Sequence, residues 1–256
     1  MLIKSKDLQG YKLNSLDGEI GSVQELYFDD RHWVVRYLVA DTGGWLPGRQ
    51  VLISPHALGA LDRDRRHIAV GLTKQAIEGS PGLDSAKPVS RRFELDYHGY
   101  YGWPMYSAGP FLWGATPIPV HDSVGSGEPT KPAGGWDPHL RSSLAVIGYH
   151  VEATDGEIGS VADFIVDDQS WAIRYLVVDT GHWLPGKKVL VSPHWIDAIR
   201  WGDSQVSVNL LRDSVRSSPE LTDAAMLTRE YESKLYRHYD REGYWVYEAA
   251  PAGRAI

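Results

Sequence analysis

The chain has 256 residues, of which 43% are hydrophobic and 23% charged, a balance typical of globular domains and unlike that of disordered chains. Its formal net charge of -7 argues against a nucleic-acid partner, because duplex binding rests on basic side chains that neutralise phosphates. The chain has no cysteine, which excludes disulfide bonds, thiolate nucleophiles and cysteine-ligated metal ions.

The first residues, from Met1 to Asp7, do not contain the apolar core of a secretory signal peptide. Elsewhere the apolar runs are far shorter than the ~20 residues that cross a bilayer. We therefore expect a cytoplasmic protein that has no membrane partner.

A long internal repeat dominates the sequence. Residues 17–56 recur as residues 155–194 at an offset of 138, and 26 of the 40 positions are identical. The similarity continues more weakly to residue 94, after which we expect the second copy to be a few residues longer. A repeat of this length predicts two homologous domains, which could pair as the two halves of a symmetric dimer do.

Short strand patterns follow one another within each copy. In the first copy we expect strands at residues 11–16, 20–28, 33–40, 50–53 and 67–70, and in the second at 171–178, 188–191 and 205–208. The dipeptide Asp17-Gly18 is typical of a hairpin turn, because glycine adopts positive φ without steric cost. Five or six short strands per copy favour a small closed or nearly closed barrel, which hides its strand edges.

One arginine falls in the middle of the strongest strand of each copy. Arg36 and Arg174 are expected either to face solvent or to pair with a carboxylate. The acidic pairs Asp29-Asp30 and Asp167-Asp168 could bind calcium weakly, but such loops are usually simple turns.

A helix is expected after each barrel. Apolar residues four apart place one stripe along each helix, with Ser90 and Thr228 as N-caps. The stripes consist of Val89, Phe93, Tyr97 and Tyr101 in the first copy and Leu227, Tyr231, Leu235 and Tyr239 in the second. Gly99 weakens the first helix by roughly 1 kcal/mol relative to alanine, so we expect the second helix to be longer.

Between the copies, residues 104–138 contain 13 glycines and prolines in 35 positions, a composition that favours an extended linker. The aromatic residues of this stretch indicate that parts of it could lie on a domain surface. The expected organisation is a first domain at 1–103, the linker at 104–138, a second domain at 139–247 and a tail at 248–256.

Three motifs in a fixed order resemble the PRC-barrel family. They are Asp17-Gly18-Glu19-Ile20-Gly21, Arg36-Tyr37-Leu38-Val39, and Gly43-Gly44-Trp45-Leu46-Pro47-Gly48 leading into Val51-Leu52-Ile53. The second copy repeats them, so the resemblance covers roughly residues 5–80 and 143–218. The predicted fold class is therefore mainly β: two tandem antiparallel PRC-barrel-like β-barrels, each followed by a short amphipathic helix, joined by a Pro/Gly-rich linker.

The family resemblance implies a docking module. Such barrels occur in a membrane-anchored component of purple bacterial photosynthetic reaction centres and in a ribosome-maturation factor that binds a ribosomal protein. This chain lacks the transmembrane helix of the former and the partner domain of the latter, so neither role is transferred. The resemblance implies no catalytic residues, and stress-related roles are suggested for stand-alone bacterial members.

Two aromatic features are the candidate interaction surfaces. One is the loop Trp45-Leu46-Pro47 with its counterpart Trp183-Leu184-Pro185, whose tryptophans either anchor a partner or fold back over their own barrel. The other is the aromatic clusters around the two helices, represented by Tyr97, Tyr101, Tyr236 and Tyr239. These tyrosines either contact a partner or pack in the core.

No catalytic, metal or cofactor site is expected. Ser54, His56 and Asp41 bring together the residue types of a hydrolase, but a serine two residues before a histidine is no recognised nucleophile motif. The histidines do not follow a metal-binding spacing, and no glycine-rich segment has the spacing of a phosphate loop.

These observations predict a non-catalytic scaffold or adaptor that binds a protein partner, with a homodimer left open. The alternative is a protein that binds a small ligand in the cleft between the barrels, because pockets often form where domains meet.

Overall fold

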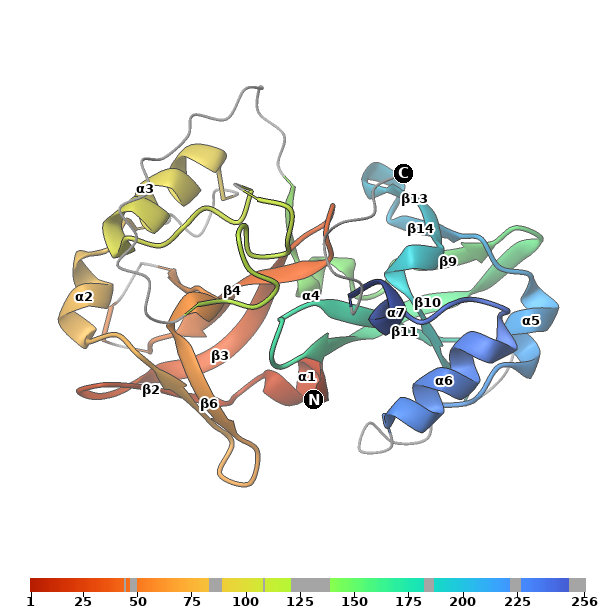
Figure 1. The fold of residues 1–256 in the computed structure, drawn as a ribbon, viewed down its shortest axis with the longest axis horizontal. Helices are drawn as coiled ribbons and strands as arrows, with labels where there is room; N and C mark the ends of the chain where they lie inside the picture. The colour runs from red at the N-terminus through yellow and green to blue at the C-terminus, as the bar shows by residue number, and fades with distance from the viewer. Residues whose placement is uncertain are drawn as a thin grey trace. The chain divides into compact units, whose positions relative to one another are not determined.

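The computed structural model describes residues 1–43, 45–46, 50–82, 89–107, 109–120, 139–181, 187–221 and 227–248. The chain divides into two compact units (Figure 1). The first contains Met1, Ile3–Val146 and Phe164–Arg174, and the second contains Leu2, Ile147–Asp163 and Tyr175–Ile256. The first unit thus includes a piece of the second sequence copy.

The first copy forms an antiparallel sheet with one parallel pair. Its strands are hydrogen-bonded in the order β5-β4-β3-β2-β7-β6, and β2 runs parallel to β7. Their bounds are β2 (Lys12–Ser15), β3 (Gly18–Asp29), β4 (Val34–Asp41), β5 (Val51–Ile53), β6 (Leu58–Asp62) and β7 (His67–Val70). The expected strands are confirmed, while β6 was not expected.

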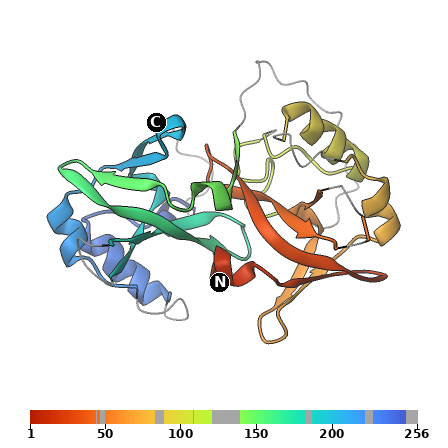
Figure 2. The same ribbon diagram turned by 180° about the vertical axis from the view of Figure 1, so that it is seen from behind.

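The second copy repeats this order as β12-β11-β10-β9-β14-β13. Its strands are β9 (His150–Ala153), β10 (Gly156–Asp167), β11 (Ile173–Asp179), β12 (Lys188–Val191), β13 (Ile196–Arg200) and β14 (Gln205–Val208). Figure 2 shows the long strands of both copies from behind. Within the described ranges, the fold is mainly β, with two seven-stranded sheets. Neither path of paired strands closes on itself there, so the expected barrels are not confirmed.

The seventh strand of each sheet comes from a short segment that precedes the other copy. Strand β8 (Leu140–Ser142) pairs with β3, and β1 (Leu2–Lys4) pairs with β10. Within the first unit, Val34 also forms a bridge with Ala172, and the ring centroids of Phe28 and Phe164 lie 5.5 Å apart. Residues of both sequence copies therefore build the core of the first unit.

Short helices complete the fold. They are α1 (Ser5–Leu8), α2 (Lys74–Gly79), α3 (Arg91–Tyr101), α4 (Ser143–Val146), α5 (Arg212–Ser217), α6 (Arg229–His238) and α7 (Tyr244–Glu248), with 3-10 turns at Pro55–Ala57, Pro193–Trp195 and Trp201–Asp203. The Ser90 and Thr228 side chains cap α3 and α6 as expected. No helix in the described part of the chain is long and apolar enough to cross a membrane.

The expectation that the second of these helices is longer is wrong: α3 has 11 residues and α6 has 10. Gly99 has no neighbouring atom within 4 Å of where a Cβ would stand, and α3 continues past it to Gly102. Gly102 ends α3 with a φ of 69°, a left-handed conformation that glycine adopts without strain. The length of α3 is therefore set by the left-handed cap at Gly102, and not by the low helix propensity of Gly99.

Within the expected linker at residues 104–138, part of the first half packs on the first unit, as its aromatic residues indicated. Met105, Tyr106 and Trp113 are buried, and the Trp113 indole N–H donates to the Ser170 carbonyl oxygen at 2.8 Å. Aromatic burial outweighs the glycine and proline content here, because each such ring removes a large apolar area from water. Residues 121–138 lie outside the described residues.

Gly21 in β3 and Gly159 in β10 explain the second glycine of the repeated hairpin motif. A Cβ at Gly21 would lie 2.0 Å from the Asp41 carbonyl oxygen, and one at Gly159 would lie 2.0 Å from that of Asp179. Both glycines have positive φ, 131° and 142°, next to a register shift in the strand pairing. Only glycine permits this close approach of two backbones.

We predict that Gly21→Ala lowers the free energy of unfolding by about 3 kcal/mol or more, since it adds a backbone clash to an unfavourable φ. Gly99→Ala is the matched control in the same unit, and it should raise stability by about 0.5–1 kcal/mol because alanine has the higher helix propensity. Urea unfolding followed by fluorescence measures both. Equal effects of the two substitutions would contradict this account of the motif.

Candidate functional site

The expected surface loop is only partly described. The side chains of Trp45 and Leu46 are half-buried, and the Lys74 ammonium group lies 5.7 Å from the centre of the Trp45 ring. Pro47 lies outside the described residues, as do Trp183, Leu184 and Pro185. The role of these loops in binding stays a prediction.

Three of the four tyrosines expected at an interaction surface are buried within the chain. Tyr97 and Tyr236 are 1% and 2% exposed, and Tyr239 is also buried. Tyr97 donates to the Leu52 carbonyl oxygen at 2.7 Å, and Tyr236 donates to the Ser192 hydroxyl at 3.2 Å. Of the two alternatives expected for these tyrosines, packing in the core is the one observed for these three, because each lies against the body of its unit. Tyr101 is half-buried.

The serine, histidine and aspartate of the first copy do not form a relay. Ser54 accepts a hydrogen bond from the His56 backbone N–H at 3.4 Å, which begins the 3-10 turn at Pro55. The His56 ring donates from Nδ1 to the Val120 carbonyl oxygen at 3.0 Å. Asp41 accepts from the Gly43 N–H at 2.9 Å. The three side chains thus hold turns and a neighbouring segment.

Arg36 lies at the centre of a buried polar cluster. It is 2% exposed and pairs with the Asp29 carboxylate at 3.1 Å. Its guanidinium group lies 3.8 Å from the ring centre of Tyr106 and 5.0 Å from that of Trp113. Burial alone would raise the pKa of Asp29, but hydrogen bonding to His32 and the charge of Arg36 hold that pKa well below its usual range.

Arg174 repeats this arrangement with the Asp167 carboxylate at 3.1 Å and the Ser170 hydroxyl at 3.2 Å. Of the two expected alternatives, pairing with a carboxylate is confirmed and exposure to solvent is wrong.

A buried glutamate follows each sheet and is surrounded by the same residue types in both copies. Glu94 in α3 is fully buried, accepts a hydrogen bond from Tyr106, and lies 3.5 Å from Arg91. His139, which precedes β8, also lies 3.5 Å from the Glu94 carboxylate. Glu94 therefore connects the helix to the segment after it and to the approach of β8.

In the second copy, Glu232 in α6 accepts hydrogen bonds from Tyr175 at 2.8 Å and Tyr244 at 2.9 Å, and it pairs with Arg229 at 3.1 Å. Tyr106 corresponds to Tyr244 at the same offset of 138. The expectation that the second copy is longer after residue 94 is therefore wrong at least as far as this tyrosine.

Besides His139, which contacts Glu94 in the first cluster, the described contacts of the two clusters differ in a second respect. Tyr37 occupies the position of Tyr175, but its hydroxyl and the Glu94 Oε2 atom are both buried without a hydrogen-bond partner in the described part of the chain. Burial raises the pKa of Glu94, and the hydrogen bond from Tyr106 opposes that rise. The ionised form of Glu94 is thus disfavoured in the folded first unit.

A groove of about 530 Å³ opens on the first unit. Small residues on and beside β6 and β7 line it, and we call them the groove floor: Ala57, Gly59, Ala69 and Gly71. The larger side chains that line it are Leu16, Leu72, Tyr101 and Trp103. Trp103 stacks on Tyr101 at 4.4 Å and on His56 at 5.7 Å between ring centroids, which fixes the orientation of its indole. Leu16 at the rim is 72% exposed.

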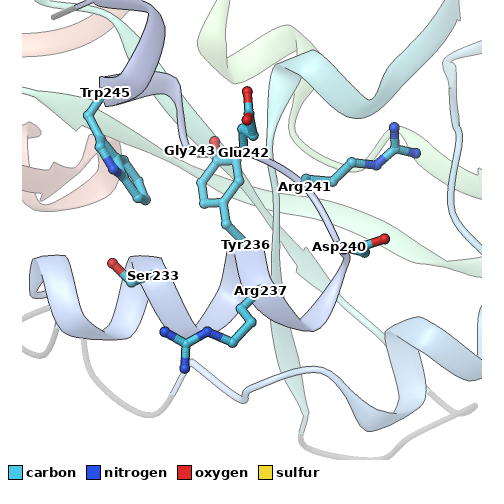
Figure 3. A pocket seen from close by; sticks show the side chains of 8 residues that line it. All are labelled: Ser233, Tyr236, Arg237, Asp240, Arg241, Glu242, Gly243 and Trp245. Carbon is cyan, nitrogen blue, oxygen red and sulfur yellow. The ribbon is translucent and has the colours of Figure 1, made fainter.

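A smaller hollow of about 320 Å³ lies on the second unit beside α6 (Figure 3). Trp245 and Tyr236 form its aromatic side, with ring centroids 5.1 Å apart. The side chains of Arg237 and Arg241 diverge, so they do not form a clamp around one anion (Figure 3). Elsewhere in the described ranges, no three histidine or carboxylate side chains are grouped as a metal ion would need.

One segment of the chain matches a known protein family. Residues 145–213 match the family model described as PRC-barrel domain, which covers the sheet of the second copy. The resemblance expected from the sequence is thereby confirmed for this segment. A search of curated proteins finds no match to the chain. The first copy has the same strand order and 26 of 40 identical positions in its most similar part.

The buried glutamates and the groove were not expected from the sequence. The signal for the first was present: arginine, glutamate three residues later and tyrosine a further twelve residues on recur at the constant offset in both copies. The signal for the groove is that the first copy has small residues where the second has larger ones, as at Ala57 and Trp195. This difference becomes visible only when the alignment of the two copies is extended beyond residue 56.

We predict opposite responses from the two glutamates. Glu94→Gln should raise the stability of the first unit at neutral pH. It removes a buried carboxyl group whose ionisation is disfavoured by burial, and the amide oxygen of glutamine can still accept the hydrogen bond from Tyr106. Glu232→Gln should destabilise the second unit by about 1–3 kcal/mol, because it weakens bonds to a charged acceptor.

The pH dependence follows from the sign of the shift. A carboxyl group with a raised pKa in the folded state binds its proton more tightly there than in the unfolded chain, so its contribution to stability falls as pH rises above the unfolded value of about 4.3. Glu94→Gln should remove this fall. Hydrogen exchange of α3 and α6, measured separately at pH 5 and 7.5 by mass spectrometry, distinguishes the variants. Faster exchange of α3 in Glu94→Gln at both pH values would disprove the assignment.

Proposed function

We propose that the chain is a non-catalytic interaction scaffold built from two PRC-barrel-like modules, and that it binds a protein partner through apolar side chains on the first module. The match of residues 145–213 to the PRC-barrel domain supports a small interaction module. The roles in stress responses and in the cytoplasm remain predictions.

One observation carries the proposal: Ser54, Asp41 and Glu94 serve internal contacts, while apolar side chains of the first module line an open groove. Ser54 and Asp41 hold turns, and Glu94 is buried beneath Tyr106. Leu16 and Trp103, in contrast, border an open groove. Apolar side chains gathered around a concave surface mark an interaction site more often than single exposed side chains do.

Site-specific crosslinking in the native host tests this function. A photoreactive amino acid at Leu16 should form a discrete adduct with one protein, because this side chain is 72% exposed at the groove rim. The same group at Arg92 is the matched control, since that side chain is 91% exposed on the outside of α3. The adduct should be absent from the control.

Crosslinks to a second copy of the chain would show that the partner is this protein itself and that the two copies form a homodimer. Adducts that form equally from both positions, or from neither, would contradict the proposed function.

A further inference from the structure

Several residues that line the groove of the first copy are smaller than their counterparts in the second copy. Ala57 and Gly59 correspond, at the offset of 138, to Trp195 and Asp197. Trp195 is 3% exposed, and its ring lies 5.2 Å from that of Tyr236. A large side chain thus occupies in the second copy the position that alanine leaves small in the first.

The same contrast continues along the floor and the rim. Ala69 and Gly71, at the end of β7, correspond to Ser207 and Asn209. At the rim, Leu16 corresponds to Thr154 and Trp103 to Arg241, so apolar residues are replaced by polar or charged ones. Eight of the twelve groove residues therefore differ in the second copy, whereas the other four, His56, Val70, Leu72 and Tyr101, are identical there.

We propose that this groove binds an extended peptide segment of a protein partner, which inserts an uncharged apolar side chain into the space lined by Leu16 and Trp103. This inference rests on the proposed function and specifies the chemistry of the partner.

The groove lining has no charged side chain, and this favours an uncharged side chain on the partner. None of the twelve residues that line the groove is Asp, Glu, Lys or Arg. A charged group placed there would lose water without gaining an ionic partner, which is costly. An aliphatic or aromatic side chain would instead remove apolar surface of Leu16, Leu72 and Trp103 from water.

The position of the groove at a sheet edge selects an extended segment. β6 is the last strand on the path of paired strands in the first sheet, and its residues Gly59 and Ala60 are exposed. Gly59 also belongs to the groove floor. An added strand could therefore bond to the backbone of β6 while its alternate side chains point into the groove, as in other complexes formed by strand addition.

Selection from a phage-displayed library of short random peptides tests this inference on the full chain. We expect enriched peptides that share an uncharged apolar residue at one position and contain few acidic or basic residues beside it. Their binding should broaden or shift the amide NMR signals of Gly59 and Gly71.

Gly59→Asp introduces the residue of the second copy at the groove floor. The substitution is sterically tolerable, because a Cβ at Gly59 would lie 3.4 Å from the Ala69 Cβ and the φ of Gly59 is not in the left-handed region. It should weaken binding of the enriched peptides by about tenfold or more, which corresponds to about 1.4 kcal/mol. Ala60→Asp adds the same charge to the next residue of β6, which does not line the groove, and should change affinity by less than about twofold.

Enriched peptides that bind Gly59→Asp as tightly as the parent chain would overturn the inference, and so would a selection that enriches none. The proposed function can survive that result, because crosslinking from Leu16 does not depend on the library. If Gly59→Asp leaves the Leu16 adduct intact, the partner binds beside the groove and the inference fails while the function stands.

Discussion

The buried charge of Arg36 constrains much of the first unit. A guanidinium group removed from water must be paired and hydrogen-bonded, or the structure loses several kcal/mol. Asp29 supplies the counter-charge at 3.1 Å, and the ring of Tyr106 covers the guanidinium plane. Tyr106 in turn donates to Glu94, which fixes α3. One charge in β4 therefore orders the turn before it, the segment after α3 and the helix itself.

In the second copy the buried arginine is also paired and hydrogen-bonded, but fewer neighbouring groups in the described part of the chain contact it. Arg174 pairs with Asp167 and Ser170, while Glu232 is fully engaged by Tyr175, Tyr244 and Arg229. The second copy thus engages this carboxylate inside the domain and packs Trp195 beside α6. The first copy leaves the Tyr37 hydroxyl and the Glu94 Oε2 atom without hydrogen bonds in the described residues and keeps a groove open. Duplication allows such a division, because one copy can retain packing while the other acquires a surface.

The sequence predicted those features whose cause is local. The hairpin at Asp17-Gly18 and the caps Ser90 and Thr228 are short-range rules, and the strands that alternate over many residues were found correctly. The short strands β1 and β8 could not be predicted, because three residues carry no periodicity and their partners lie far away in the sequence. The sequence indicated that aromatic residues such as Trp113 could lie on a domain surface, but not which surface, since the hydrogen bond from Trp113 to Ser170 joins residues 57 positions apart.

The candidate site depends on comparison within the molecule more than on any motif. Neither Ala57 nor Gly59 suggests binding when it is considered alone, because small residues usually reflect close packing. Their meaning appears only when Trp195 and Asp197 are seen at the same places in a domain of the same strand order. Packing density in protein interiors is nearly constant, so a residue that shrinks without compensation leaves a hollow. In the first copy Trp103 stacks on His56 and lines the open groove, into which the side chain of the proposed partner would fit.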